Sequence, residues 1–285
     1  MNTLKTGFLL TVMTLFFISI GQYLGGAGGM RIAFIFALVM NIGSYWFSDK
    51  LILKMYKAKK IDSNRFSEIK IIFTNLCKKA NIVEPQLFIY SAIEPNAFAT
   101  GRNQNNSVVA LSTGLISILD MDEIEGVMAH ELAHIENRDI LIGSIAATFA
   151  GAISMIASMI KWGLIFGAFR GNRNSGSFLG NILIAILAPL IALIIQMAIS
   201  RTREFKADSS AAQITSKPKS LAKALSKIQD FHMKSKENKE LNKELQAATC
   251  HMFIISPISG GVGKWFSSHP PTEERVKRLM DMNIS

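Results

Sequence analysis

Four long stretches of the chain contain no charged residue and consist mostly of apolar ones. They are Thr6–Met30, Ile32–Ser48, Ile140–Ile160 and Phe178–Ser200. About 20 apolar residues in a helix cross the roughly 30 Å hydrocarbon core of a bilayer, and even the shortest stretch lies within the usual range. A soluble core seldom needs such runs repeatedly, so the pattern predicts four transmembrane helices.

The first two stretches follow each other so closely that they predict a helical hairpin, with its tight turn at Gln22–Gly29. A cleaved signal peptide is the alternative, because Lys5 gives a weak charged start and Gly25–Gly29 contains small residues. The apolar run is long for a signal peptide, and a second run follows at once. Both facts favour the hairpin.

The polar regions show the periodicities of shorter helices and strands. Asp120 followed by Glu123 is a capping-box pattern that predicts the start of a helix. The predicted helices are Asn64–Ala80, Met121–Arg138, Thr202–Ile214, Pro218–Met233 and Glu273–Met282, the last capped by Thr272. The predicted strands are Gln86–Tyr90 and a β-hairpin formed by Asn96–Gly101 and Ser107–Leu111.

These elements together predict a mainly α membrane protein with a small sheet. A transmembrane hairpin is expected over residues 1–48 and a second transmembrane pair over 140–200. The two polar parts, 49–139 and 201–285, would lie on the same side of the membrane, because an even number of crossings separates them.

The net charge of +10 is unevenly placed along the chain. Basic residues cluster after the second and fourth stretches, at Lys50, Lys54, Lys57, Lys59, Lys60, Arg201, Arg203 and Lys206. The opposite ends carry only Arg31, Arg170 and Arg173. The positive-inside rule therefore predicts that the N-terminus and both polar parts face the cytoplasm. The basic residues suit anionic lipid headgroups, whereas nucleic-acid binding is excluded because no basic domain stands apart from the membrane segments.

The predicted helix over 121–138 contains the sequence His-Glu-Leu-Ala-His at positions 130–134. Residues four apart share one helical face, so His130 and His134 can bind one tetrahedral zinc ion. Glu131 is offset by one residue and can act as general base toward a water at that zinc. The alternative is a helix with two surface histidines.

A catalytic zinc also needs a third protein ligand. The metzincin pattern is excluded, because Ile140 stands where its third histidine would be. Glu204 and Asp208 lie four apart on a predicted helix, so Glu204 can bind zinc while Asp208 holds a ligand histidine. A solvated charged face fits the same spacing equally well. Asp139 can brace a ligand histidine too, but we interpret it as a polar boundary residue before the membrane.

The HExxH motif, two apolar stretches and the segment Glu204-Phe-Lys-Ala-Asp208 together resemble the HtpX-type membrane metalloproteases, relatives of the CAAX prenyl endopeptidases. The resemblance covers nearly the whole chain, from the hairpin to the tail. It implies a zincin-like α+β catalytic domain with a small edge sheet. It also implies one Zn²⁺ per chain, with Glu204 as the third ligand beside His130 and His134.

Two further segments resemble parts of the same family. Residues 95–99 look like its edge strand beside the cleft, which implies substrate contacts for Asn96, Ala97, Phe98 and Ala99. The tail from His269 to Arg275 looks like its His-Pro segment, which implies that both residues aid substrate binding or transition-state stabilisation. The alternatives are a helix-entry residue for His269 and a surface ion pair with Glu273 or Glu274 for Arg275.

The expected reaction is zinc-dependent hydrolysis of peptide bonds in polypeptide substrates, with the site on the cytoplasmic side of the inner membrane. The resemblance implies a role in the quality control of damaged or misfolded membrane proteins. An intramembrane protease is the first alternative, although the charges on the motif helix are costly in hydrocarbon. Prenyl-peptide processing and a non-enzymatic membrane scaffold are the others.

Overall fold

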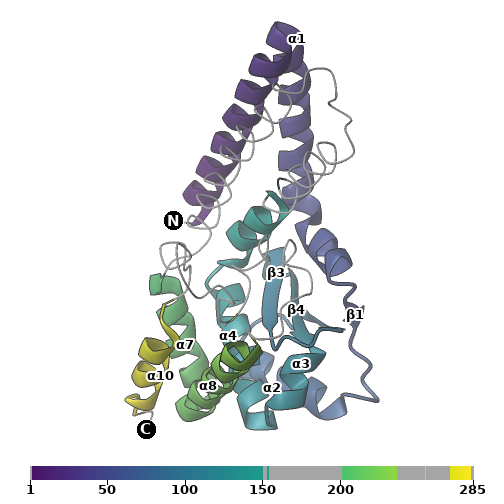
Figure 1. The fold of residues 1–285 in the computed structure, drawn as a ribbon. Helices are drawn as coiled ribbons and strands as arrows, with labels where there is room; N and C mark the ends of the chain where they lie inside the picture. The colour runs from purple at the N-terminus through teal and green to yellow at the C-terminus, as the bar shows by residue number, and fades with distance from the viewer. Residues whose placement is uncertain (1, 150–152, 154–200, 236–253, 255–269, 284–285) are drawn as a thin grey trace.

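The computed structural model describes residues 2–149, 153, 201–235, 254 and 270–283. The predicted stretch Phe178–Ser200 and the candidate His269 lie outside the described residues, as does most of Ile140–Ile160 beyond residue 149. The described residues form a long helical hairpin and a globular part built of helices and a sheet (Figure 1).

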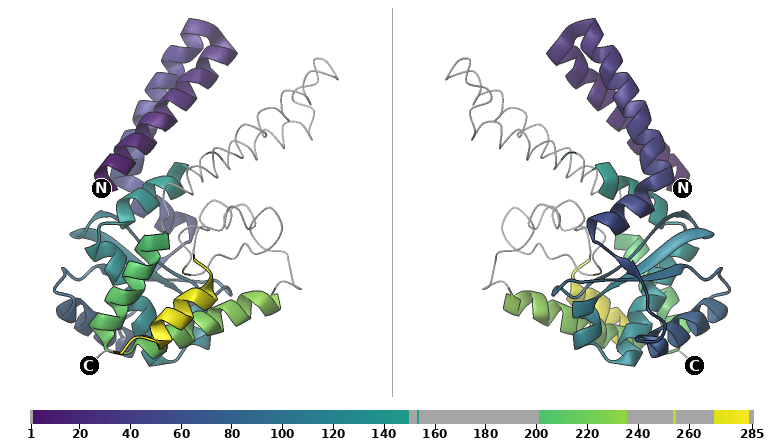
Figure 2. Two further views of the ribbon diagram at one scale, coloured as in Figure 1. Left: turned by 90° about the vertical axis from the view of Figure 1, so that its left-hand side faces the viewer. Right: turned by 90° about the vertical axis from the view of Figure 1, so that its right-hand side faces the viewer.

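Helix α1, Asn2–Met55, is a hairpin whose two legs lie side by side and project from the globular part (Figures 1 and 2). The helical conformation breaks at Gly25 and Gly26, and Gly26 has a φ of 55°, which glycine adopts without steric cost. The legs approach closely near the turn, because a Cβ on Gly21 would lie 2.4 Å from Ala33 Cβ. The turn therefore falls within the predicted range.

One described helix, Gly25–Met55, is long and apolar enough to cross a membrane by length and composition. Very little of this segment is buried within the protein, and large side chains such as Phe34 and Trp46 are exposed. Thr6–Gln22 and Ile140–Phe149 are apolar helices of shorter length. Of the four predicted transmembrane helices, the described residues thus give one clear candidate and two shorter apolar helices. The glycine-rich turn ends the first leg, and the stretch Ile140–Ile160 is described continuously only to residue 149.

A four-stranded mixed sheet lies in the globular part, with the strand order β1-β2-β4-β3. Its strands are β1 (Lys59–Lys60), β2 (Gln86–Tyr90), β3 (Ala97–Asn103) and β4 (Asn106–Ser112). The β2 and β4 strands run parallel, and β3 pairs antiparallel with β4. The predicted β-hairpin is present, and it makes β3 an edge strand of the sheet.

Six described helices complete the globular part. They are α2 (Ser67–Lys79), α3 (Thr113–Ile118), α4 (Met121–Glu136), α7 (Arg201–Thr215), α8 (Pro218–Ser235) and α10 (Thr272–Met280). The predicted helices are confirmed with small shifts in their ends. The cap predicted for the last helix is wrong, because Thr272 is its first residue and Pro271 occupies the cap position without a side-chain hydrogen bond.

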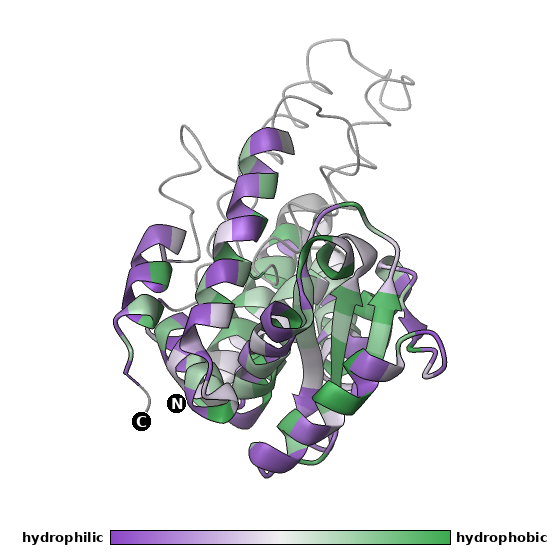
Figure 3. Ribbon diagram, turned by 90° about the horizontal axis from the view of Figure 1, so that it is seen from below, coloured by the Kyte–Doolittle hydropathy of each residue, from purple (hydrophilic) through white to green (hydrophobic). Residues whose placement is uncertain are grey.

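Helix α4 lies at the centre of this part and packs against α2, α7, α8 and the sheet. Close packing with α8 depends on Gly126, where a Cβ would lie 3.1 Å from the Leu221 backbone. Hydrophobic residues gather in the strands and on inward helix faces, while outward helix faces are hydrophilic (Figure 3). The core around α4 includes Phe73, Leu76, Val109, Leu111, Ile124, Val127, Leu132, Ala211 and Leu225.

Candidate active site

The start of α4 is fixed by a complete capping box. Asp120 Oδ1 accepts a hydrogen bond from the Glu123 N–H, and Glu123 Oε2 accepts one from the Asp120 N–H, both at 2.9 Å. Lys227 on α8 also donates to Glu123 Oε2 at 2.6 Å. A cap of this kind satisfies backbone donors that the first helical turn leaves free, so the predicted helix start is confirmed.

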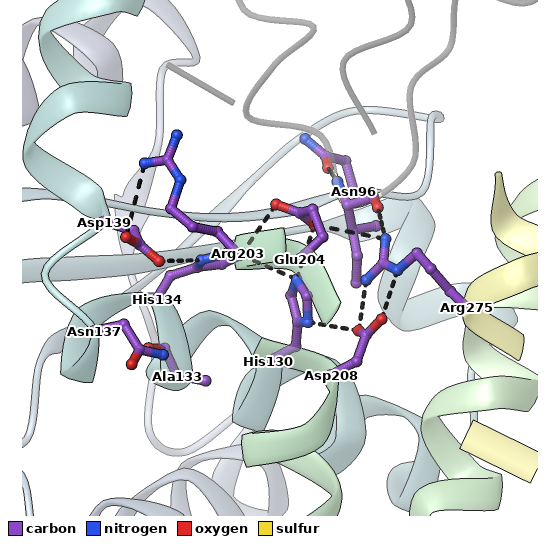
Figure 4. A network of polar contacts seen from close by, with 11 residues as sticks. Asn96, His130, Ala133, His134, Asn137, Asp139, Arg203, Glu204, Asp208 and Arg275 are labelled. Carbon is purple, nitrogen blue, oxygen red and sulfur yellow. Dashed lines mark hydrogen bonds and ion pairs between the residues drawn. The ribbon is translucent and has the colours of Figure 1, made fainter. Parts of the chain in front are cut away.

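Three side chains from two helices meet above α4 (Figure 4). The Nε2 atoms of His130 and His134 lie 3.1 Å apart. Each of them lies 3.6 Å from a carboxylate oxygen of Glu204, which α7 supplies. One ligand atom from each of the three residues lies within 4.8 Å of the others. Two imidazoles and one carboxylate at this spacing can hold one metal ion, and they are the donor set of many catalytic zinc sites.

A buried carboxylate holds the other ring nitrogen of His130. Asp208, one helical turn after Glu204, places Oδ1 3.0 Å from His130 Nδ1. Arg275 in turn binds both oxygens of Asp208, through Nε at 2.8 Å and Nη2 at 2.7 Å. The bidentate geometry fixes the carboxylate, and the carboxylate fixes the imidazole.

The second histidine also has a carboxylate beside its Nδ1 atom. Asp139 Oδ2 lies 3.4 Å from His134 Nδ1, and Asp139 Oδ1 lies 3.7 Å from Arg203 Nη1. Our interpretation of Asp139 as a polar boundary residue is therefore wrong. The residue does stand just before an apolar helix, but its side chain turns back toward the histidine (Figure 4).

Comparison with known proteins agrees with this geometry. The profile of Peptidase family M48 matches residues 63–283. A protease HtpX homolog of Desulfatibacillum aliphaticivorans is 48% identical over 281 residues, which cover 98% of this chain and 89% of that protein. Another from Persephonella marina is 47% identical over 284 residues, covering 99% and 98%. A third, from Pyrococcus abyssi, is 46% identical over 277 residues, covering 97% and 94%.

The chain belongs to peptidase family M48. It is a metallopeptidase of the membrane-associated HtpX group, so the non-enzymatic alternative is excluded. The crystal structure of S. mikatae Ste24p is similar in fold, with a TM-score of 0.51 and 19% identity. That similarity covers 99% of this chain and 66% of the other.

Glu131 of the peptidase lies between the metal cluster and the edge strand. Its side chain is buried, and burial raises the pKa of its carboxyl group, although the nearby His130 and His134 oppose the shift. The Ala99 backbone N–H of β3 lies within hydrogen-bond reach of this carboxylate. A raised pKa brings a carboxylate closer to the neutral range in which a general base works best.

The outer edge of β3 faces this cluster. The Asn96 carbonyl accepts from the Ser112 N–H, so the even-numbered residues of the strand bond to β4. By alternation, the backbone groups of Ala97, Ala99 and Gly101 point away from the sheet. The Gly101 N–H is already taken by the Ser144 hydroxyl at 3.1 Å, whereas the Ala99 N–H faces Glu131.

The four residues expected to contact substrate contribute unequally. The side chains of Ala97 and Phe98 are buried in the core. Ala97 can therefore contact a peptide only through its backbone, whereas the backbone groups of Phe98 bond to β4. Asn96 is buried as well, and its Oδ1 accepts from the Ile254 N–H at 3.2 Å. Its Nδ2 atom has no hydrogen-bond partner among the described residues. This buried donor lies close to the Tyr90 hydroxyl, and a contact between Asn96 and substrate stays a prediction.

Arg275 is neither a surface residue nor paired with the neighbouring acids, so that alternative is wrong. It is 1% exposed, and its Nη1 donates to the Ile254 carbonyl at 2.7 Å while its other nitrogens bind Asp208. Arg275 Nη1 also lies 3.7 Å from Glu204 Oε2. In this structure Arg275 supports the two acids of α7, and a direct part in catalysis stays a prediction.

Proposed function

We propose that this peptidase is a membrane-bound, zinc-dependent endopeptidase that cleaves cytosol-facing parts of damaged or misfolded membrane proteins. The observation that carries the proposal is the meeting of His130, His134 and Glu204 beside the buried Glu131. Family M48 membership supports zinc as the ion, and one ion per chain suits a single cluster of this kind among the described residues.

His130, His134 and Glu204 would hold the zinc, which supplies Lewis acidity for the scissile carbonyl and the attacking water. Glu131 is the residue placed to accept the proton of that water and then deliver it to the leaving amine. Burial favours both steps, because it raises the pKa of Glu131 toward neutrality. Asp208 and Arg275 keep His130 oriented during the reaction.

An extended substrate would add to the free edge of β3 as a further strand. The outward backbone groups of Ala97 and the outward carbonyl of Ala99 would provide its hydrogen bonds, since the Ala99 N–H already faces Glu131. Recognition through backbone hydrogen bonds selects an extended conformation of the substrate rather than particular side chains. This mode suits unfolded segments of many sequences, which supports a role in quality control.

The proposed location combines the apolar helix of the hairpin with the placement of basic residues. We assign the catalytic part to residues 49–139 and 201–285, on the cytoplasmic side. Helix α4 packs against α7, α8 and the sheet rather than among apolar helices alone, which argues against an intramembrane active site.

The test compares three purified, full-length proteins in detergent with added zinc: wild type, Glu131→Gln and Glu136→Gln. Glu136 lies on the same helix but is exposed, so it serves as the matched control. We expect wild type and the control to degrade casein and an unfolded membrane protein. Glu131→Gln should bind zinc equally but cleave roughly 10²–10⁴-fold more slowly. Equal cleavage by Glu131→Gln and wild type would refute the assignment.

A further inference from the structure

The turn that follows α4 places Asp139 next to the metal-ligand histidine His134. Arg138 has a left-handed φ of 58°, its N–H donates to the Ile135 carbonyl at 3.1 Å, and the Asp139 N–H donates to the His134 carbonyl at 2.9 Å. These two bonds form a Schellman motif, which usually places glycine at the left-handed position. A side chain at that position costs about 1–2 kcal/mol, so the conformation has to be held by other contacts.

The motif returns the chain over its own last turn and brings the Asp139 carboxylate to His134. Asp139 is 8% exposed, with Oδ2 at 3.4 Å from His134 Nδ1. Its other oxygen faces Arg203, one residue before the ligand Glu204, at 3.7 Å. A carboxylate that merely marked the edge of a membrane segment would have no reason to face a ring nitrogen.

The two ligand histidines are thus supported in the same way. His130 has Asp208, backed by Arg275, and His134 has Asp139, backed by Arg203 (Figure 4). In each set an arginine balances the negative charge of the carboxylate, and the carboxylate faces the Nδ1 atom of the histidine. The Nε2 atoms are left to face Glu204.

We propose that Asp139, held by Arg203, is a positioning residue for His134. Its carboxylate accepts the N–H of Nδ1, which selects the tautomer whose Nε2 lone pair can bind zinc and sets the angle of the ring. The inference rests on the proposed zinc site. It also means that residues at both ends of segment 140–200 cooperate in building that site, because Asp139 precedes the segment and Arg203 follows it.

The test measures zinc affinity in the full-length protein by competition with a chromogenic chelator at one fixed pH. Carboxylates that support ligand histidines typically contribute 10–100-fold to metal affinity, so Asp139→Asn should weaken zinc binding by that factor. Arg203→Gln should weaken it several-fold, and Arg203→Lys should recover part of the loss. Asp122→Asn is the matched control, since Asp122 lies exposed at the other end of α4, and its affinity should stay within twofold of wild type.

A second readout separates positioning from a general effect on folding. The visible absorption spectrum of the Co²⁺-loaded protein reports the angles at the metal, so it should change in Asp139→Asn and not in Asp122→Asn. Wild-type affinity and an unchanged spectrum in Asp139→Asn would overturn the inference while leaving the proposed function intact. A wild type that binds no zinc would instead refute the proposed function. If Asp139→Asn does not fold, the Arg203→Gln affinity decides in the same way.

Discussion

Arg275 holds a full positive charge at 1% exposure, where an unpaired ion would be very costly. Its partner Asp208 is buried too. Burial alone would raise the pKa of Asp208, but the charge and hydrogen bonds of Arg275 outweigh it and lower that pKa to about 2. The two residues therefore stabilise the fold as a pair, and either one alone would destabilise it as an uncompensated buried charge.

Replacing Arg275 by Ala should lower the free energy of unfolding by about 3–5 kcal/mol, because it leaves the buried Asp208 carboxylate without a counter-charge. Arg275→Lys should not restore it, since an ammonium group cannot make the bidentate contact. Urea unfolding of the detergent-solubilised protein measures the change. Lys277→Ala, on an exposed position of the same helix, should stay within about 0.5 kcal/mol, and a similar loss there would contradict the explanation.

Zinc binding should weaken as the solution is acidified below about pH 9. In the metal-free protein, burial lowers the pKa of His130, but the hydrogen bonds that its ring donates to Asp208 and Glu204 outweigh it and raise the pKa to about 9. Zinc requires the neutral imidazole, so apparent affinity should rise by up to roughly tenfold per pH unit until that pH. Calorimetry at pH 7 in buffers of different ionisation enthalpy measures the released proton, and binding without release would be inconsistent with this pKa.

At this scale, the sequence was most informative where one helix contains all the relevant residues. The spacing of His130 and His134 predicts their shared face directly, and it places Glu131 beside them. The spacing of Glu204 and Asp208 does not decide whether Glu204 is a ligand or part of a solvated face, because the answer depends on the packing of α7 against α4. Only the family resemblance supplied that ligand. The sequence does not indicate a role for Asp139 beside His134, because its position before an apolar stretch does not reveal the turn at Arg138 that directs its side chain toward the histidine.

Among the elements, β3 leaves no room for a side chain at Gly101, near its distal end. Gly101 has a φ of 142°, and a Cβ there would lie 2.2 Å from the Asn106 carbonyl oxygen. Gly101→Ala should therefore destabilise the protein by about 1–3 kcal/mol and distort the edge of the proposed substrate site. Thermal unfolding together with the KM for an unfolded substrate tests this. Gly143→Ala, where an added Cβ meets no atom within 4 Å, should show no loss of stability.

Element prediction succeeded for segments with a clear period and failed for very short ones. The β2 strand was predicted with its observed ends, and α4 was predicted from its capping box and apolar spacing. The β1 strand has two residues and α3 has six, which is too little for a period to be recognised. Both depend on neighbours, because β1 pairs with β2 and α3 follows directly from β4.

For the molecule as a whole, the proposed zinc ion should act as a cross-link between α4 and α7. Ligand binding to the folded state alone stabilises by about 4 kcal/mol when free metal exceeds Kd a thousandfold. Removing zinc with a chelator should therefore lower the melting temperature, and adding zinc back should restore it. His134→Ala is the control, since its melting temperature should be insensitive to zinc. A zinc-dependent shift of equal size in that variant would place the metal elsewhere.

The ion pair between Asp208 and Arg275 joins positions 67 residues apart and depends on the docking of α10. While the chain is being synthesised, the carboxylate behind His130 lacks its counter-charge until that last described helix emerges. The proposed active site is therefore complete only after both α7 and α10 have been synthesised. If activity requires that support of His130, the protease would become active only late in its own synthesis, which would shorten the time in which it could cleave its unfinished chain.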